Sequence, residues 1–253
     1  MTSAAPAGGY DPSHFAKLFE LEGSSFWFRG RSDLINWALD RNFPGARSFL
    51  ELGCGTGYVI DRVRQIHPDW RLVGTELFEE GLAKARIRMP DNVELRQMDA
   101  TALPYDSEFD VAGAFDVIEH IQDADAVLAG MYKGIKPGGG LLITVPQHRW
   151  LWSEADVVAH DVKRYTRGEL RDDLSAAGFE VIRIASFVSL LLPAMMASRL
   201  LKKDAGNVEE ELDMAAPLNK ACYAAMRLEG ALVKAGVNFP AGGSLLAVAR
   251  RPA

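Results

Sequence analysis

The sequence is poor in several features that define whole classes of protein. Its 253 residues include two cysteines, Cys54 and Cys222, and no CxxC pair or cluster of cysteine and histidine. A structural zinc site or a disulfide framework is therefore not expected. Basic residues are outnumbered too, with 28 lysines and arginines against 34 acidic residues and a net charge of −6. That balance argues against a protein that binds nucleic acids regardless of sequence, because such binding depends on a basic surface.

The sequence also has no long apolar run, and its first residues are not expected to act as a secretory leader. The longest apolar run, residues 188–197, contains Pro193 and is too short to span a bilayer. The first nine residues, MTSAAPAGG, lack the basic stretch and apolar stretch of a signal peptide. We therefore interpret residues 1–9 as a disordered tail and residues 10–253 as one domain, and we expect a cytoplasmic protein.

From residue 48 onward, strand signals alternate with helix signals. Seven strands are predicted, at 48–53, 71–76, 93–99, 109–115, 141–146, 179–187 and 244–251. Helices are predicted between them, at 58–66, at 79–88, from the end of the fourth strand to about residue 135, and after the capping box Thr166–Glu169. The run KPGGG at 136–140 reads as a turn.

This alternation predicts an α/β fold, a doubly wound and mainly parallel sheet with helices on both faces. Residues 10–45 are expected to form N-terminal helices. The long connection at 188–243, between the last two strands, is expected to be a helical insertion that caps the core.

The stretch ELGCGTG, residues 51–57, places three glycines in the loop after the first strand. In an open α/β sheet such a loop lies at the carboxyl ends of the strands, where ligands bind. A dinucleotide fingerprint would need its third glycine at Tyr58, and a P-loop would need a following Gly-Lys-Ser/Thr. The loop has neither, and the carboxylate of Glu51 suits a cationic ligand better than a phosphate.

A second acidic residue, Glu76, ends the second predicted strand. A carboxylate about 20 residues after the loop can accept hydrogen bonds from the hydroxyls of a ribose. Both acids fit a ligand that has a ribose, a positive charge and no phosphate, and S-adenosylmethionine has these features. A nicotinamide dehydrogenase is the alternative for this loop, and the glycine spacing and Glu51 disfavour it.

Five stretches in order resemble the motifs of class I S-adenosylmethionine-dependent methyltransferases. They are ELGCGTG, Glu76, QMDATALPYDSEFD at 97–110, FDVIEHI at 115–121 and KPGGGLLITVP at 136–146. The resemblance covers residues 48–187, and SLLAVARR at 244–251 matches the closing strand of that family. It implies a seven-stranded sheet with the last strand antiparallel, and S-adenosylmethionine as cofactor.

The resemblance also implies roles for individual residues. The methionine part of the cofactor would lie near Glu51 and the glycine loop, the ribose on Glu76, and the adenine against Leu77. The implied cofactor-binding set is Arg31, Glu51, Gly53, Cys54, Gly55, Gly57, Glu76, Leu77, Asp99, Ala100 and Phe115.

Arg31 belongs to FWFRGR, residues 26–31, where an arginine of a leading helix can pair with the methionine carboxylate in the resembling family. The alternative is a helix that packs Phe26 and Phe28 into the core and leaves both of its arginines in solvent.

Three histidines are candidates for a general base, in the order His160, His148 and His120. In a helix, Asp156, His160 and Arg164 would share one face, since they are four residues apart. The alternative for His160 is a structural pair with Asp156 that anchors Tyr165.

The run DVIEH, residues 116–120, resembles the E-x-x-E-H run of ubiquinone-pathway O-methyltransferases, whose acids and histidine bind a divalent cation. The first residue here is the shorter Asp116, which disfavours a metal, and none is predicted.

We predict transfer of the methyl group of S-adenosylmethionine to a small-molecule acceptor, with O-methylation of a partly apolar metabolite as the first interpretation. The aromatics Trp150, Trp152 and Tyr165 and the apolar insertion favour such an acceptor. Methylation of nitrogen or carbon in a natural-product, lipid or glycan precursor is an alternative, as is a protein that binds the cofactor without methylating. We expect no nucleic-acid partner and no stable membrane span. The apolar insertion is compatible with a homodimer.

Overall fold

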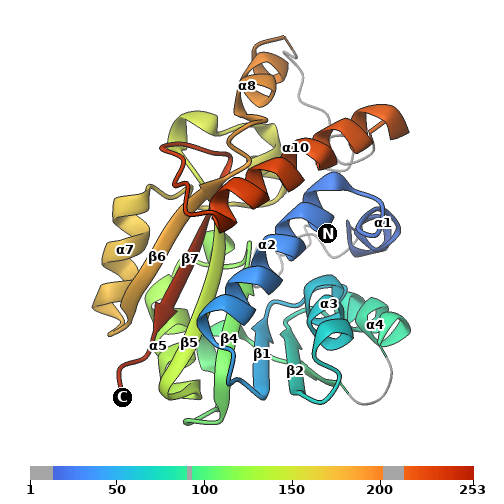
Figure 1. Ribbon diagram of the computed structural model, residues 1–253. Helices are drawn as coiled ribbons and strands as arrows, with labels where there is room; N and C mark the ends of the chain where they lie inside the picture. The colour runs from blue at the N-terminus through green and yellow to red at the C-terminus, as the bar shows by residue number, and fades with distance from the viewer. Residues whose placement is uncertain (1–13, 90–92, 202–213) are drawn as a thin grey trace, which may run out of the picture.

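The structure, a computed structural model, describes residues 14–89, 93–201 and 214–253. Within them, seven strands form one sheet in the order β3-β2-β1-β4-β5-β7-β6 (Figure 1). Strand β7 runs antiparallel to β5 and β6, and the other pairs are parallel. The predicted fold is therefore confirmed. The strands are β1 (Ser48–Leu52), β2 (Arg71–Glu76), β3 (Glu94–Gln97), β4 (Phe109–Phe115), β5 (Ile135–Pro146), β6 (Glu180–Phe187) and β7 (Ser244–Arg250).

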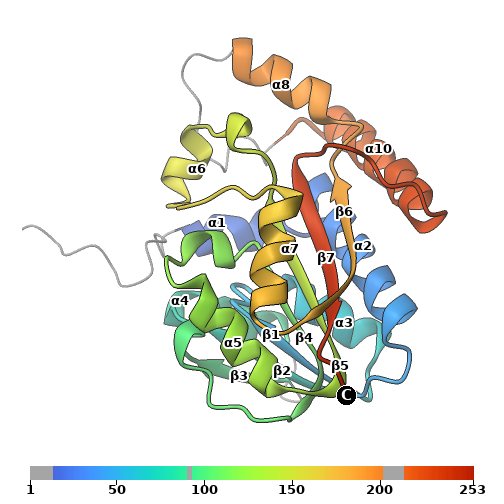
Figure 2. The same cartoon turned by 90° about the vertical axis from the view of Figure 1, so that its left-hand side faces the viewer.

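Helices cover both faces of this sheet, as Figures 1 and 2 show. One face carries α2 (Phe26–Asn42), α3 (Tyr58–Ile66), α4 (Glu79–Arg88) and α10 (Ala216–Lys234), and the other carries α5 (Ala124–Gly134) and α7 (Arg167–Ala176). A buried apolar cluster lies on each face. Phe49 and Leu50, neighbours on β1, are both fully buried but belong to opposite clusters. Alternate side chains of a strand point to opposite faces, so each strand anchors both layers.

The segments outside the alternating pattern, where they are described, contain helices. α1 (His14–Leu21) packs on α4, and α2 follows it. In the sequence, α8 (Leu192–Leu201) and α10 come between β6 and β7. In the structure, α10 packs along α2 (Figure 1). The predicted tail at residues 1–9 lies outside the described residues.

Two predicted boundaries are wrong. β5 begins at Ile135, and the predicted turn at 136–140 lies inside it as an irregularity, because pairing with β4 jumps from Phe109–Ile135 to Val111–Gly140. The helix predicted to follow β4 directly is two pieces, the 3-10 turn η2 (Ile118–His120) and α5. α5 starts late because the Asp123 side chain caps it by accepting from the backbone N–H of Ala126.

Between β1 and β4, the order of strands along the sheet reverses direction. β1 and β4 are neighbours, but β1 leads outward to β2 and β3 whereas β4 leads to β5. Ligands of open α/β sheets bind at such a point, beyond the carboxyl ends of the strands. The glycine loop at 53–57 follows β1 and the segment 116–121 follows β4, so both meet there.

Candidate active site

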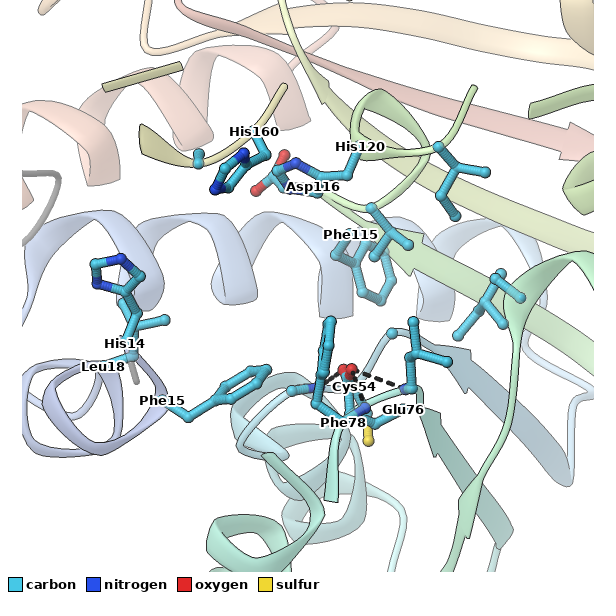
Figure 3. Close-up of a pocket in the computed structure, with 18 of the residues that line it drawn as sticks. His14, Phe15, Leu18, Cys54, Glu76, Phe78, Phe115, Asp116, His120 and His160 are labelled. Atoms are coloured by element: carbon cyan, nitrogen blue, oxygen red, sulfur yellow. Dashed lines mark hydrogen bonds between the residues drawn. The ribbon is translucent and has the colours of Figure 1, made fainter. Parts of the chain in front are cut away.

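A cavity of about 900 Å³ opens at this switch point (Figure 3). Pockets that bind small ligands measure roughly 300–1,000 Å³. Its walls come from the glycine loop, the ends of β2 and β4, the helices α1 and α2, and the segment 152–162. The predicted residues that line it are Arg31, Glu51, Gly53, Cys54, Gly55, Glu76, Leu77, Asp99, Ala100, Phe115, His120 and His160.

The glycine loop adopts a conformation that only glycine takes easily. Gly53, Gly55 and Gly57 have φ angles of 64°, 54° and 78°. A Cβ atom on Gly57 would also lie 2.5 Å from Cε of Met89. Gly57 does not line the cavity, so it acts by shaping the turn into α3.

Glu76 fastens the loop to the end of β2. Its carboxylate accepts hydrogen bonds from the backbone N–H groups of Gly55 at 2.9 Å, Leu77 at 2.8 Å and Phe78 at 3.1 Å (Figure 3). A carboxylate offers about four acceptor positions, so it retains capacity for a ligand hydroxyl. Burial raises the pKa of Glu76, and these three bonds lower it.

Glu51 is the clearest electrostatic anomaly of the cavity. Its side chain is 3% exposed, and no described residue hydrogen-bonds to its Oε2 atom. Burial raises the pKa of Glu51 to about 8, against the smaller opposing effect of the Arg31 charge. A buried polar atom without a partner is unfavourable, and a cationic group of a ligand would satisfy it.

Arg31 is buried too, so the alternative that leaves the arginines of residues 26–31 in solvent is wrong for this residue. Its guanidinium pairs with the carboxylate of Asp116, and that carboxylate also accepts from Oγ1 of Thr144 at 3.0 Å. The rings of Trp27 and Phe28 have centroids 5.8 and 5.4 Å from its Cζ. Its pairing with a ligand carboxylate stays a prediction.

Asp99 lies at the exposed side of the cavity, next to Ala100. Its carboxylate accepts from the backbone N–H and the hydroxyl of Thr101, both at 2.8 Å, and these bonds lower its pKa. Asp99 thus caps the 3-10 turn η1 (Ala100–Ala102), and its contact with an adenine stays a prediction.

His160 lines the cavity, but the segment around it differs from the prediction. The helix α6 (Glu154–Val158) ends before His160, whose φ is 58°, so Asp156, His160 and Arg164 do not share a helix face. Nor does Asp156 pair with His160, because its Oδ1 lies 2.6 Å from Nε of Arg164. The four-residue spacing predicted one continuous helix, but the buried Asp156–Arg164 ion pair forms across a turn instead.

His148, the second candidate base, is not among the residues that line the cavity. Its ring stacks on Trp150, with centroids 5.1 Å apart, and burial lowers its pKa.

His120 lines the cavity, and its Nδ1 atom lies 2.9 Å from Oδ1 of Asp161. Figure 3 places it beside Asp116 and His160, across Phe115 from Glu76. Within the described residues, no three or more His, Cys, Asp or Glu side chains are arranged to hold a metal ion.

Several wall residues carried no sequence signal. Phe15 and Glu22 come from α1 and the turn after it, and Glu22 accepts from Nη2 of Arg88 at 2.7 Å. Asp161 was also missed, although it follows a candidate base directly. Its neighbour in the structure, His120, lies 41 positions earlier in the sequence, and no local sequence pattern predicts that contact.

Comparison with known proteins agrees with this geometry. A family model described as a methyltransferase domain matches residues 25–184. A probable S-adenosylmethionine-dependent methyltransferase of Mycolicibacterium smegmatis is 30% identical over 164 residues, which cover 64% of this chain and 62% of that protein. The ubiquinone biosynthesis O-methyltransferase of Pseudomonas entomophila is 27% identical over 165 residues, which cover 58% of this chain and 70% of that protein.

A solved structure shares the whole fold. In a complex between the Haloferax volcanii Trm112 methyltransferase activator and a protein named as a methyltransferase, one chain superposes with a TM-score of 0.65 at 18% identity. The match covers 96% of this chain and 94% of that one. The chain therefore belongs to the methyltransferase-domain family, within the class I S-adenosylmethionine-dependent methyltransferases. Among the helices of the described residues, none is both long and apolar enough to cross a membrane.

Proposed function

We propose that this protein transfers the methyl group of S-adenosylmethionine to a hydroxyl group of a small, partly apolar acceptor. One observation carries the proposal: a single cavity joins the buried carboxylate of Glu51, whose Oε2 atom has no hydrogen-bond partner among the described residues, to an end that bears His120, His160 and apolar side chains. The first end suits a cationic cofactor, and the second suits removal of a proton from an acceptor.

The residues present fit the cofactor. Glu51 offers an unsatisfied carboxylate oxygen for an ammonium group, Glu76 keeps acceptor capacity for a ribose hydroxyl, and Gly53 and Gly55 bring the backbone close. When bound, S-adenosylmethionine supplies a methyl group on a positively charged sulfur, which becomes the neutral thioether of S-adenosylhomocysteine once the acceptor oxygen takes the methyl. Positioning supplies much of the rate of such a transfer, and a general base adds roughly 10²–10⁴-fold.

The acceptor end of the cavity has large apolar side chains beside its histidines. Trp152, Val157 and Val162 are exposed large apolar side chains, and all three line it. A second cavity of about 780 Å³ shares Ile121, Gln122, Trp152 and Val162 with the first, so the acceptor side has further room. These walls support an acceptor with an apolar body, because burying apolar surface stabilises its binding.

The choice of oxygen rests on two supports. Histidines of the cavity suit a hydroxyl, which must lose its proton during transfer. Relatives named as ubiquinone biosynthesis O-methyltransferases point the same way. The cytoplasmic location and a homodimer remain predictions from the sequence.

Two experiments test the function. Calorimetric titration with S-adenosylhomocysteine and, separately, with NAD should show micromolar binding of the first alone. Turnover is then measured as S-adenosylhomocysteine release, with catechol and 4-methylcatechol as neutral phenolic probes and their dimethyl ethers, which have no free hydroxyl, as controls. Binding of NAD alone would overturn the cofactor assignment. Methylation of amines in the same assay, with the phenols inert, would overturn the assignment to oxygen.

A further inference from the structure

A second cavity lies beside the candidate active site and continues its acceptor end. It measures about 780 Å³ and opens where the start of α5, the helix α7 and the segment 149–165 meet (Figure 2). It shares Ile121, Gln122, Trp152 and Val162 with the first cavity. Pockets that bind small molecules have volumes of this order. An acceptor that reaches past these four residues can therefore occupy both cavities.

The charges that line the second cavity are mostly paired within the protein. The three cations of its lining each have an acidic partner, in the pairs Arg149–Glu169, Lys163–Asp173 and Arg164–Asp156. A further acid, Asp125 in the first turn of α5, lines the cavity without an ion-pair partner among the described residues. The three pairs cancel, so the charge of Asp125 remains. Such a lining disfavours an anionic ligand, because like charges repel.

Two hydrogen-bond donors of this cavity have no acceptor among the described residues. Arg164 is 6% exposed, and its Nε and Nη1 donate to Asp156 and to the carbonyl oxygen of Gln147, but no described residue accepts from its Nη2. The hydroxyl of Tyr165, a residue 1% exposed, has no described acceptor either. Neither atom is sealed in the interior, so each faces the cavity that its residue lines. A ligand that displaces solvent there must offer oxygen acceptors to both.

The other polar groups of the cavity complement these donors. Burial raises the pKa of Tyr165, and nearby carboxylates, including Asp173 and Asp125, raise it further, so its hydroxyl remains a donor at neutral pH. The Asp125 carboxylate offers acceptor oxygens, and the amide of Gln122 can both donate and accept. Trp152, which is 42% exposed, adds a large aromatic ring at the border of the two cavities.

We infer that the second cavity binds a neutral, hydroxyl-rich part of the acceptor, such as a sugar ring, while the reacting hydroxyl lies in the first cavity. This inference rests on the proposed methyl transfer and specifies the acceptor as a hydroxyl compound that carries a glycosyl group. A sugar ring has apolar C–H faces that suit an aromatic side chain, and hydroxyls that both donate and accept.

Two other kinds of acceptor tail fit the lining less well. An anionic tail would satisfy the two free donors but would meet the unpaired carboxylate of Asp125. A purely apolar tail would displace solvent from Arg164 and Tyr165 without replacing the hydrogen bonds that they lose.

The test is a binding titration of the full-length protein, followed by NMR signals of the ligand, with and without S-adenosylhomocysteine. The β-D-glucoside and β-D-galactoside of hydroquinone carry a neutral sugar, 4-methoxyphenol presents the same phenol without one, and the matching uronides add a carboxylate. At least one glycoside should bind about tenfold tighter than 4-methoxyphenol and at least about threefold tighter than its uronide. Two glycosides that bind no tighter than 4-methoxyphenol, or a uronide that binds as tightly as its glycoside, would overturn the inference.

Two variants test whether the sugar lies in the second cavity. Tyr165→Phe removes the free hydroxyl and keeps the buried ring, so it should lower the affinity ratio of glycoside to 4-methoxyphenol about threefold. Asp125→Asn should lower this ratio as well, and should reduce the preference for the glycoside over its uronide because the repelling charge is gone. The control is Asp172→Asn, which changes an exposed aspartate of α7 that lines neither cavity and should leave both ratios unchanged. Unchanged ratios in both test variants would overturn the assignment.

Turnover separates this inference from the proposed function. If a glycoside binds with the expected ratios but no hydroxyl probe is methylated, the proposed methyl transfer to oxygen fails and the role of the second cavity stands. If the glycosides and 4-methoxyphenol are methylated with equal kcat/KM, the proposed function stands and the inference is overturned.

Discussion

Binding of S-adenosylhomocysteine is expected to expel a proton from Glu51. In the cavity without ligand, burial raises the pKa of this carboxyl to about 8. At pH 7 about 0.9 of the molecules would therefore carry the proton. An ammonium group placed at Oε2 favours the charged form and lowers the pKa by roughly 1–3 units. The bound state would then keep between about 0.5 and 0.01 proton at pH 7.

The difference gives the size of the effect. We expect about 0.4–0.9 proton released per ligand at pH 7, and about 0.1 or less at pH 9, where the free carboxyl is already mostly ionised. By linkage, the affinity should rise between about pH 6 and pH 8 and level off above that range. Calorimetry at one pH in phosphate and in Tris measures the number directly, because the two buffers differ in ionisation enthalpy.

The matched control is Glu51→Gln, which keeps the shape of the side chain and cannot titrate. Any proton exchanged by the amino group of the ligand contributes to both proteins, so the difference between them isolates Glu51. Release below 0.2 proton at pH 7 in the wild type, or equal release in the variant, would refute the assignment of Glu51 to the cationic part of the ligand.

Three further substitutions test other parts of the site. Glu76→Gln should weaken S-adenosylhomocysteine binding by about 1–3 kcal/mol by calorimetry, because hydrogen bonds to a charged acceptor are lost, and a change of less than twofold in Kd would contradict its role. Gly57→Ala should destabilise the fold by about 2 kcal/mol or more in urea unfolding, through its positive φ and its contact with Met89, whereas Gly45→Ala, with no atom near its Cβ, should change stability by less than 0.5 kcal/mol. His160→Ala should keep cofactor affinity within about twofold and reduce turnover by roughly tenfold or more, since His160 lines the cavity, and unchanged turnover would show that His160 is not the base.

The frame of the site could be predicted because each of its signals is local. The glycine loop, the strand before it and the helix after it are encoded by consecutive residues, and α3 and β2 have the predicted bounds. Glu51 and Glu76 end up in the cavity because they stand at strand ends, and in a parallel sheet those ends meet at one edge.

The acceptor side could not be predicted because its contacts are long-range. The spacing of Asp156, His160 and Arg164 fits a helix, but a buried ion pair and a left-handed residue replace the helix there. Helix propensity is a weak preference that tertiary contacts override. Asp161, which contacts His120, lies in a turn 41 positions later in the sequence. Nothing in the sequence around either residue predicts this contact.

The carboxylates at the two ends of the cavity differ in whether the protein supplies them with a partner, and this difference fits one reaction. Asp116, which lines the cavity near the acceptor end, is paired with Arg31, and Asp161 lies 2.9 Å from His120, so these two lining carboxylates have cationic or proton-binding neighbours within the protein. Glu51 has none for its Oε2 atom and lies buried at the other end. A cavity of this kind favours a ligand whose positive charge falls at Glu51, because that charge relieves an existing penalty while a second cation near Asp116 would compete with Arg31. The same reasoning makes a neutral acceptor the better fit at the histidine end, where its hydroxyl can give up a proton to a histidine of the cavity.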